Sequence, residues 1–469
     1  MKSAPVLSSA VNTGEGGERA GAAAWYALAV LVLVTLFSFV DRQVFVLQAQ
    51  PIKEQLGLTD LQLGLLQGVG VALFAAVAGY PLGWLADRFE RRLILCLCVL
   101  AWSVAVAACG LAEGFGGLFF AGAMVGAAEA GLTPIIFALI PELFRGRQRY
   151  LANSTFAIAT RLGIGLAIAF CGQLVHWVEL ARPWLPASLQ AMEGWRLTFM
   201  AAALPAPLMV LLILSIRLPR RTSESPTGVA KAEAAEAPAS PAAPAAPAAP
   251  SGVSVGDFLR AHVRSFVGFY AGIGMAVFGF ASIIGWVPTI TMRMYGDTAT
   301  QAGNATGTAT LIATGIGFAF SWWGVKLLEP RLGARLPMVV LWTATLSAAV
   351  TTVMLLWTTS AMQIYVLQGV QMAFVMAGIM LYPTALQNLC PAHLRSRIVA
   401  INGVVGAVCG ALSPPAVGAL SDALSPRPDA LLIAAVAVAG VSLLVSAALL
   451  WWGTGSYAAT VRDAEARSA

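Results

Sequence analysis

Long apolar runs separated by short polar segments are the dominant pattern of this chain. Apolar stretches of about 20 residues, the length that crosses a bilayer as a helix, occur twelve times. The pattern therefore predicts an all-α membrane protein with twelve transmembrane helices, near residues 24–47, 62–86, 93–112, 116–141, 151–175, 196–217, 266–290, 304–327, 336–357, 361–388, 398–420 and 430–452.

The longest polar interruption, residues 218–265, divides these helices into two groups of six. Its PAAPAAPAAP run is typical of an extended linker, and the SVGDFLRAHVRSF segment after it is typical of a short amphipathic helix on the bilayer surface. The N-terminal residues lack the features of a cleaved signal peptide, so we expect the first helix to be retained. The predicted organisation is a tail (1–23), a six-helix bundle (24–217), the linker (218–265), a second bundle (266–452) and a tail (453–469).

The two predicted bundles carry a weak internal repeat. FRGRQRYLAN follows the fourth helix and LRSRIVAIN follows the tenth, so that Arg-x-Arg precedes Asn153 and Asn402 at equivalent positions. Two pseudo-symmetric six-helix halves are typical of transporters that rock one half against the other around a central site.

Composition and charge agree with a membrane protein. Hydrophobic residues make up 58% of the chain and charged residues 11%, and the mean hydropathy is +0.79. Most of the 28 Lys and Arg residues fall on the side of the two termini, which predicts a multi-pass protein of the cell (inner) membrane with both termini in the cytoplasm. Basic loops facing anionic headgroups account for the net charge of +6 without nucleic acid.

Metal and nucleotide chemistry have no sequence signature here. The six cysteines form no Cys-x-x-Cys pair, the three histidines lie in or near loops, and no phosphate-binding glycine loop is present. We expect no cofactor, no enzyme activity and a monomer.

A glycine and charge motif lies between the second and third helices, in GYPLGWLADRFERR. It resembles the signature loop of the major facilitator superfamily, with Glu90 where the family has glycine. Glycine permits close helix approach, and the charges form a network that breaks when the cytoplasmic side opens. The resemblance predicts a cytoplasmic gate made of Gly83, Asp87, Arg88, Arg91 and Glu142, the last from the end of the fourth helix.

A narrower resemblance is carried by FVDRQVFVLQAQPIKEQLGLTDLQLGLLQG, VGAAEAGLTP and IIGWVPTIT. These segments are similar to the Spinster family, and the resemblance implies transport of a lipid-like anion such as a lysophospholipid or a sphingoid phosphate. It also implies roles for the helix 1 acid–base pair and the helix 4 glutamate.

Four charges are embedded in the predicted helices: Asp41, Arg42, Glu129 and Arg161. At a rise of 1.5 Å per residue they share one layer of the membrane, and their cost in lipid argues against accidental placement. Glu129, and after it Asp41, are the candidate proton carriers. Arg42 either holds Glu129 ionised or binds an anionic substrate, and Arg161 either neutralises Glu129 or contacts the substrate. The alternative is that the four charges only form structural ion pairs.

Further candidate substrate contacts are neutral. Thr35 and Ser38 lie on one stripe with Arg42, and the second half offers Tyr270, Trp286 and Gln371, which could equally be interhelical hydrogen-bond partners. A charged half facing an apolar and aromatic half fits an amphipathic anion. The alternatives are a transporter of small organic or sugar acids and, from another class, a membrane sensor or enzyme.

Overall fold

The computed structural model describes residues 21–144, 146–216, 255–391 and 394–466. Nearly all of them are helical. Eleven helical stretches of these residues are long and apolar enough to cross a membrane, and one of them, Ala299–Trp357, is broken at Gly333, which has a φ of 50°. Dividing that stretch at Gly333 gives the twelve spans that the sequence predicts.

The first half contains six spans, three of which are interrupted helices. Its elements are α1 (Ala22–Leu47), α2 (Ala49–Leu56), α3 (Asp60–Leu65), the π-helix η1 (Leu66–Gly70), α4 (Val71–Arg88), α5 (Arg91–Leu111), α6 (Phe115–Glu129), α7 (Leu132–Leu143), α8 (Gly146–Ala181), the 3-10 turn η2 (Arg182–Trp184), α9 (Ala187–Gln190), α10 (Gly194–Ala203) and α11 (Ala206–Ser215).

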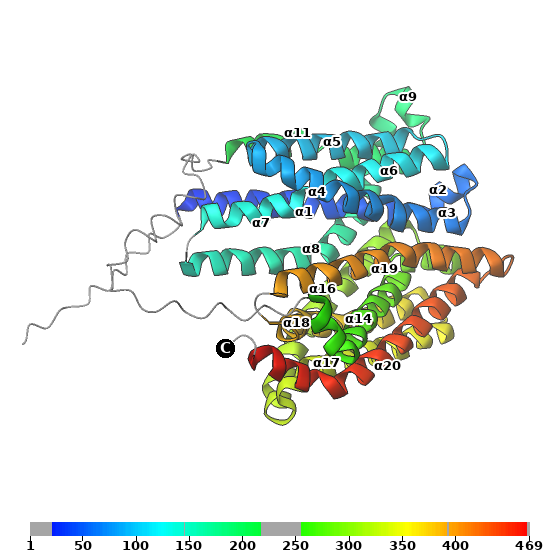
Figure 1. The fold of residues 1–469 in the computed structure, drawn as a ribbon. Helices are drawn as coiled ribbons and strands as arrows, with labels where there is room; N and C mark the ends of the chain where they lie inside the picture. Colours follow the sequence, from blue (N-terminus) through cyan, green and yellow to red (C-terminus); the bar gives the residue numbers. More distant parts are fainter. Residues whose placement is uncertain (1–20, 145, 217–254, 392–393, 467–469) are drawn as a thin grey trace, which may run out of the picture.

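The second half contains the other six spans. Its elements are α13 (Val255–Ala261), α14 (Val263–Ile284), α15 (Val287–Tyr295), α16 (Ala299–Leu332), the 3-10 turn η3 (Gly333–Arg335), α17 (Leu336–Met354), the 3-10 turn η4 (Leu355–Trp357), α18 (Ala361–Asn388), α19 (Arg395–Leu424) and α20 (Ala430–Ala466). Figure 1 shows the two halves as two adjacent bundles, with α8, α16 and α19 along the boundary between them.

The segments flanking the second bundle differ from expectation. Residues 218–254 of the expected linker and residues 1–20 and 467–469 of the expected tails lie outside the described residues. Helix α13 does not present its apolar side to a bilayer surface, because Phe258 is 1% exposed and joins a buried cluster with Tyr457 and Val461 of α20. Helix α20 continues to Ala466 through most of the expected tail. The apolar face of α13 is therefore covered by the last helix of its own bundle.

Two seams join the bundles at the end where α1 finishes and α3 and α16 begin, here called the distal end. In the α8–α16 seam, a Cβ added to Gly307 would lie 2.6 Å from the Ala169 nitrogen and 2.8 Å from the Gly165 oxygen. A Cβ on Gly303 would lie 2.8 Å from the Cα of Gly172. Because lipid gives helices no hydrophobic drive to associate, small residues that allow backbones to touch are the usual basis of such contacts.

The second seam joins α3 and η1 to α19. A Cβ on Gly64 would collide with the backbone at Pro414, and one on Gly418 would collide with the backbone of Asp60. Gly68 likewise faces the Ala411 carbonyl oxygen without room for a side chain. The bundles are thus in backbone contact along both flanks of the distal end.

The α8–α16 seam predicts the effect of a side chain at Gly307. Gly307→Val should separate the two helices, because overpacking of this kind costs about 1–3 kcal/mol. Double electron–electron resonance can measure this separation. Spin labels on cysteines that replace the exposed Leu180 and Met362, in a background without native cysteines, should then report a longer distance. Gly315→Val on the same helix is the matched control, since a Cβ there meets nothing within 4 Å. Equal distance distributions in both variants would contradict the assignment of the seam.

Candidate functional site

Arg42 and Glu129 form an ion pair between the first and fourth spans. The Arg42 Nε and Nη2 atoms donate to Glu129 Oε2 at 2.9 and 2.8 Å. The Glu129 side chain is 3% exposed, whereas the Arg42 side chain is 50% exposed. The guanidinium therefore has a buried carboxylate on one side and open space on the other.

Glu129 occupies the last residue of α6, directly before a helix break. The chain passes through Ala130 and Gly131 before α7 begins at Leu132. Among the described residues, Glu129 Oε1 is buried without a hydrogen-bond partner. One carboxylate oxygen thus binds Arg42, and the other has no partner among the described residues.

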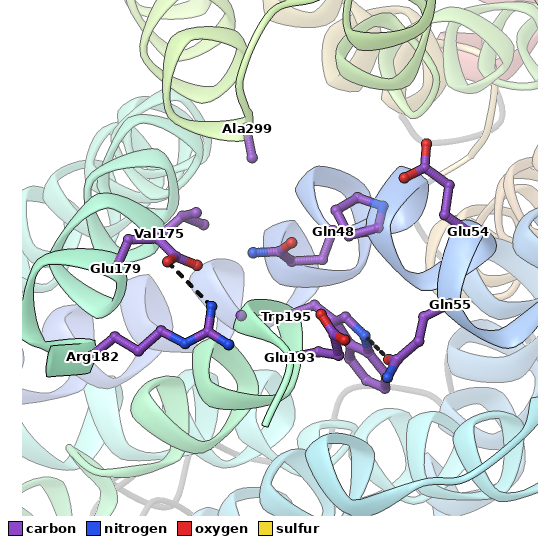
Figure 2. Close-up of a pocket in the computed structure, with 11 residues that line it drawn as sticks. Gln48, Glu54, Gln55, Val175, Glu179, Arg182, Glu193, Trp195 and Ala299 are labelled. Carbon is purple, nitrogen blue, oxygen red and sulfur yellow. Dashed lines mark hydrogen bonds and ion pairs between the residues drawn. The ribbon is translucent and has the colours of Figure 1, made fainter. Parts of the chain in front are cut away.

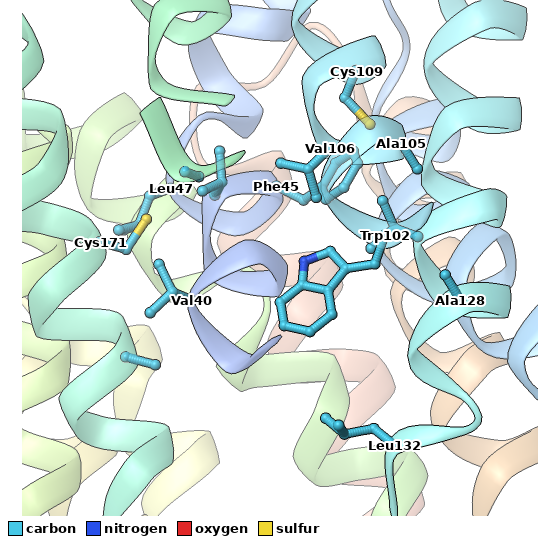
Figure 3. Packing of buried hydrophobic residues seen from close by; sticks show 14 of the residues in the cluster. Val40, Phe45, Leu47, Trp102, Ala105, Val106, Cys109, Ala128, Leu132 and Cys171 are labelled. Atoms are coloured by element: carbon cyan, nitrogen blue, oxygen red, sulfur yellow. The ribbon is translucent and has the colours of Figure 1, made fainter. Parts of the chain in front are cut away.

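Asp41 is buried within the first bundle and bonds to a different helix from Arg42. It is 3% exposed, and its Oδ2 accepts a hydrogen bond from Nε1 of Trp102 on α5. Figure 3 shows the Trp102 indole reaching from α5 toward α1, with Leu132 below it and Ala128 on the side away from α1. Sequence reasoning missed Trp102, because a tryptophan in an apolar span gives no signal of its own.

Arg161 does not join the other three charges. It lies half-buried on α8, and no hydrogen bond or ion pair to it occurs within the described part of the chain. The expectation that it neutralises Glu129 is therefore wrong for this conformation, since Arg42 fills that role.

The open side of Arg42 faces a cavity of about 450 Å³ between the bundles. Its polar lining comes from Arg42, Gln43 and Gln67, and the rest is mostly small residues of η1, α4 and α19, including Ala75, Ala76, Gly406 and Gly410. The cavity therefore offers one cation and two amides within an otherwise apolar wall.

The neutral candidate contacts lie mainly in helix packing. Thr35 and Ser38 are buried and donate to the carbonyl oxygens of Leu31 and Thr35 on their own helix. Tyr270 donates to the Ile398 carbonyl oxygen at 2.8 Å, and Gln371 donates to Thr352 on α17 at 2.5 Å.

Trp286 is the exception among the neutral candidates. It is fully buried, and its Nε1 has no partner among the described residues. None of the five neutral candidates lines the cavity that Arg42 faces.

The predicted gate is only partly assembled. Arg91 donates to Glu142 at 2.6 Å within the first bundle, and the Arg88 guanidinium lies 4.1 Å from the ring centre of Trp84. The side chain of Asp87 lies outside the described residues. The expectation that Gly83 brings helices together is wrong for this conformation, because a Cβ there would meet nothing within 4 Å.

A buried charge cluster at the distal end was not predicted. Asp60 is 3% exposed. Its carboxylate accepts hydrogen bonds from Lys53 at 2.6 Å and from two nitrogens of Arg293 at 2.6 and 2.8 Å. It also accepts one from Ser421 at 2.7 Å. Asp422 accepts the backbone N–H groups of Asp60 and Leu61, both at 2.9 Å. Arg293, Ser421 and Asp422 belong to the second half, so this cluster ties the two bundles together. One signal in the sequence could have indicated this cluster. Few basic residues are expected at the distal end, and Lys53 and Arg293 are two of them, which makes them candidate partners for an acid there.

A polar pocket of about 500 Å³ also lies at the distal end. Figure 2 shows Glu179 and Arg182 on one wall and Trp195 with Gln55 on another. Glu179 and Arg182 form an ion pair of 3.7 Å, and Trp195 donates to Gln55 at 2.5 Å. None of the embedded charges lines this pocket.

Comparison with known proteins places these features in a family context. Residues 31–414 match the family described as Major Facilitator Superfamily. A bacterial homologue of the human lysosomal transporter Spinster, solved in an inward-facing and unoccupied conformation, superposes with a TM-score of 0.72 at 23% identity, over 96% of this chain and 99% of that one. The fold is therefore that of a known group of transporters.

Curated relatives are similar over shorter stretches. An MFS-type efflux pump of Mycolicibacterium smegmatis is 29% identical over 44% of this chain and 46% of its own length. Protein spinster homolog 1 of Xenopus tropicalis is 31% identical over 33% of this chain and 31% of its own length. A D-galactonate transporter of Escherichia coli is 23% identical over 68% of this chain and 70% of its own length. The chain thus spans less than half of the length of the first two relatives. The first and the third are described as a pump and a transporter.

The distal cluster predicts a large effect of losing the Asp60 charge. Asp60→Asn leaves Arg293 and Lys53 without their carboxylate, and removing one partner of a buried pair costs about 3–5 kcal/mol. We expect faster maleimide labelling, from the distal side, of a cysteine placed in the α3–α19 seam. Asp429→Asn, which removes an exposed ion pair with Arg427, should leave labelling unchanged. Similar labelling rates in both variants would argue against a role in distal closure.

Proposed function

Because the chain belongs to the Major Facilitator Superfamily, we propose that it is a proton-coupled secondary transporter of an amphipathic anion. In this proposal the two bundles alternate access to the cavity that Arg42 faces. The observation that carries it is the position of the Arg42 guanidinium, which contacts buried Glu129 on one side and the cavity on the other.

Charge balance couples the proton to the substrate. When an anionic group enters the cavity and takes Arg42, Glu129 loses its counter-ion inside the membrane. An unpaired buried carboxylate is costly, and protonation removes that cost. Glu129 Oε1, which has no partner among the described residues, is the natural atom to receive the proton. One substrate anion therefore enters together with one proton.

The apolar part of the substrate is assigned to a groove further along α19. This groove of about 460 Å³ is lined by apolar residues of α13, α14 and α19 together with Tyr270 and Arg260. Its residue Val405 lies within two turns of Gly406 and Gly410 on α19, which line the Arg42 cavity. An anionic head on Arg42 with a tail along α19 suits a lysolipid or sphingoid phosphate, in keeping with the Spinster resemblance.

Arg161 is assigned as a second anion contact. It is a half-buried cation on a helix of the seam, without a partner among the described residues. A phosphate with two negative charges would use a second cation, whereas a single carboxylate would not.

A sugar acid is the second candidate substrate. The relative described as a D-galactonate transporter favours it, and Gln43 and Gln67 beside Arg42 would hydrogen-bond hydroxyl groups.

The orientation completes the proposal. With both termini in the cytoplasm of the inner membrane, as the basic loops predict, the distal end is the outer one. Contact between the bundles at that end then corresponds to an inward-facing state, the conformation in which the similar Spinster homologue was solved. The Asp60 cluster would act as the outer gate, and Arg91 with Glu142 as part of the inner one.

The proton role of Glu129 predicts a split between two transport modes. In proteoliposomes loaded with lysophosphatidylglycerol, Glu129→Gln should abolish accumulation driven by a pH gradient but retain counterflow, because the neutral amide mimics the protonated acid. Glu54→Gln, in the distal pocket, should behave like the native protein. A Glu129→Gln variant with unchanged pH dependence would refute Glu129 as the carrier.

The substrate assignment predicts which ligand stabilises the purified protein. A ligand at 100 times its Kd stabilises the folded state by about 2.7 kcal/mol, so a thermal-shift series should respond to lysophosphatidylglycerol. Arg42→Gln should remove the response. Stabilisation by D-galactonate instead of the lysolipid would favour the second candidate, and stabilisation that survives in Arg42→Gln would reject the Arg42 site.

A further inference from the structure

We propose that a pocket near the end of α16 binds the headgroup of a phospholipid that carries both a phosphate and a primary ammonium group, such as phosphatidylethanolamine. This pocket lies at the end of the bundle opposite the distal end. It shares no lining residue with the cavity that Arg42 faces. The inference therefore goes beyond the proposed function and does not depend on which substrate is transported.

The position of the pocket suits a lipid. It has a volume of about 520 Å³, and its apolar lining comes from Phe318 and Val325 of α16 and Met380 of α18. Trp322 also lines it and is 64% exposed, and the next residue, Trp323, is 57% exposed. Exposed tryptophans near the end of a spanning helix are typical of the level at which lipid headgroups lie. The pocket is therefore placed where a headgroup joins its acyl chains.

Two opposite charges line the pocket without neutralising each other. Lys326 and Glu329 both belong to the lining, and residues three apart on a helix have Cβ atoms about 5–6 Å apart. Within the described part of the chain, neither forms an ion pair with the other or with a third residue. The Lys326 ammonium lies 5.6 Å from the ring centre of Trp322, which is within the range of a cation–π contact. A ligand with one negative and one positive group would neutralise both side chains.

Ser321 adds an unpartnered hydroxyl to the same pocket. It is 6% exposed, it lines the pocket, and no hydrogen bond from its side chain occurs among the described residues. The other buried serines described in the second half all form side-chain hydrogen bonds. Because buried polar groups normally have partners, the hydroxyl of Ser321 points to a ligand that accepts a hydrogen bond.

An ethanolamine phosphate headgroup matches these residues. Its phosphate accepts hydrogen bonds from the Lys326 ammonium and the Ser321 hydroxyl, and its ammonium donates to the Glu329 carboxylate. Its two-carbon spacer keeps the two charges apart, as the helix keeps Lys326 and Glu329 apart. Phosphatidylglycerol has no cation for Glu329, and the trimethylated ammonium of phosphatidylcholine has no N–H to donate. The pocket therefore favours the primary amine among these lipids.

Native mass spectrometry of the full-length protein in detergent, titrated with each of the three lipids, measures the apparent Kd of the site. Phosphatidylethanolamine should have the lowest Kd. Ser321→Ala should raise that Kd about tenfold, the effect of losing one hydrogen bond to a charged group, and Lys326→Met should raise it at least as much. Equal Kd values for the three lipids in the native protein would overturn the assignment.

Glu329→Gln tests the assignment through a change of preference. Without the carboxylate, phosphatidylethanolamine should bind about tenfold more weakly, whereas phosphatidylglycerol should bind more tightly because the repulsion is gone. Arg462→Met and Glu465→Gln are the matched controls, since these exposed residues have the same spacing near the end of α20 and do not line the pocket. Both controls should bind lipids like the native protein. A Glu329→Gln variant with the native order of preference would show that Glu329 does not read the headgroup.

Two further measurements identify the occupant and separate this inference from the proposed function. Glycerophosphoethanolamine, which has the same headgroup without acyl chains, should compete weakly, and competition as strong as that of the lipid would reject a lipid as the occupant. Arg42→Gln should keep the native Kd for phosphatidylethanolamine, and loss of that binding would place the lipid in the central cavity instead. If Arg42→Gln keeps its response to the transported anion as well, the proposed function fails and this pocket stands.

Discussion

Contact between the two bundles at the distal end is the constraint on which the rest of this structure depends. Within a membrane, helices gain little by burying apolar side chains, because lipid is equally apolar. The bundles meet instead where glycines such as Gly307 and Gly64 let backbones touch, and where Asp60 gathers cations from both halves. This closed end sets the separation of α1 and α4 from α19, and hence the cavity that Arg42 faces. A site between two halves needs one end that stays in contact. The opposite end can then open while the residues that line the cavity stay close together.

The embedded charges follow a different rule from the seams. Asp41, Arg42, Glu129 and Arg161 all belong to the first half. Polar groups of the second half, such as buried Gln371 and half-buried Tyr270, bond to neighbouring helices. In the proposed mechanism, the first half changes its protonation without rearranging the second. Proton uptake would then change which anion the Arg42 guanidinium binds, while the seams respond to the position of the bundles.

Some of this arrangement could be predicted from the sequence, and the reason is geometric. Helix rise fixes depth in the membrane, so counting residues from the span ends correctly brought Arg42 and Glu129 together. Depth does not fix the direction in which a side chain points, so it could not show that Arg161 makes no contact with Glu129. Depth could not reveal the Trp102–Asp41 hydrogen bond either, because that bond depends on how α5 is rotated about its axis relative to α1. The Asp60 cluster was missed because it requires the packing of one half on the other, which a single sequence does not encode locally.

The choice between a lipid-like anion and a sugar acid depends on which polar and apolar groups a substrate can reach in this conformation. A hydroxylated substrate would relieve unpartnered polar atoms in the second half, such as Trp286 Nε1 and Thr306 Oγ1, which lack partners among the described residues. Those residues are 0% and 1% exposed, so no substrate reaches them while the distal end is closed. The apolar groove along α14 and α19 is open in the same conformation, with Val263 and Val267 48% and 44% exposed. In the proposed mechanism, a substrate bound in this state meets Arg42, two amides and an apolar wall. That surface matches a charged head with a hydrocarbon tail better than a ring of hydroxyl groups.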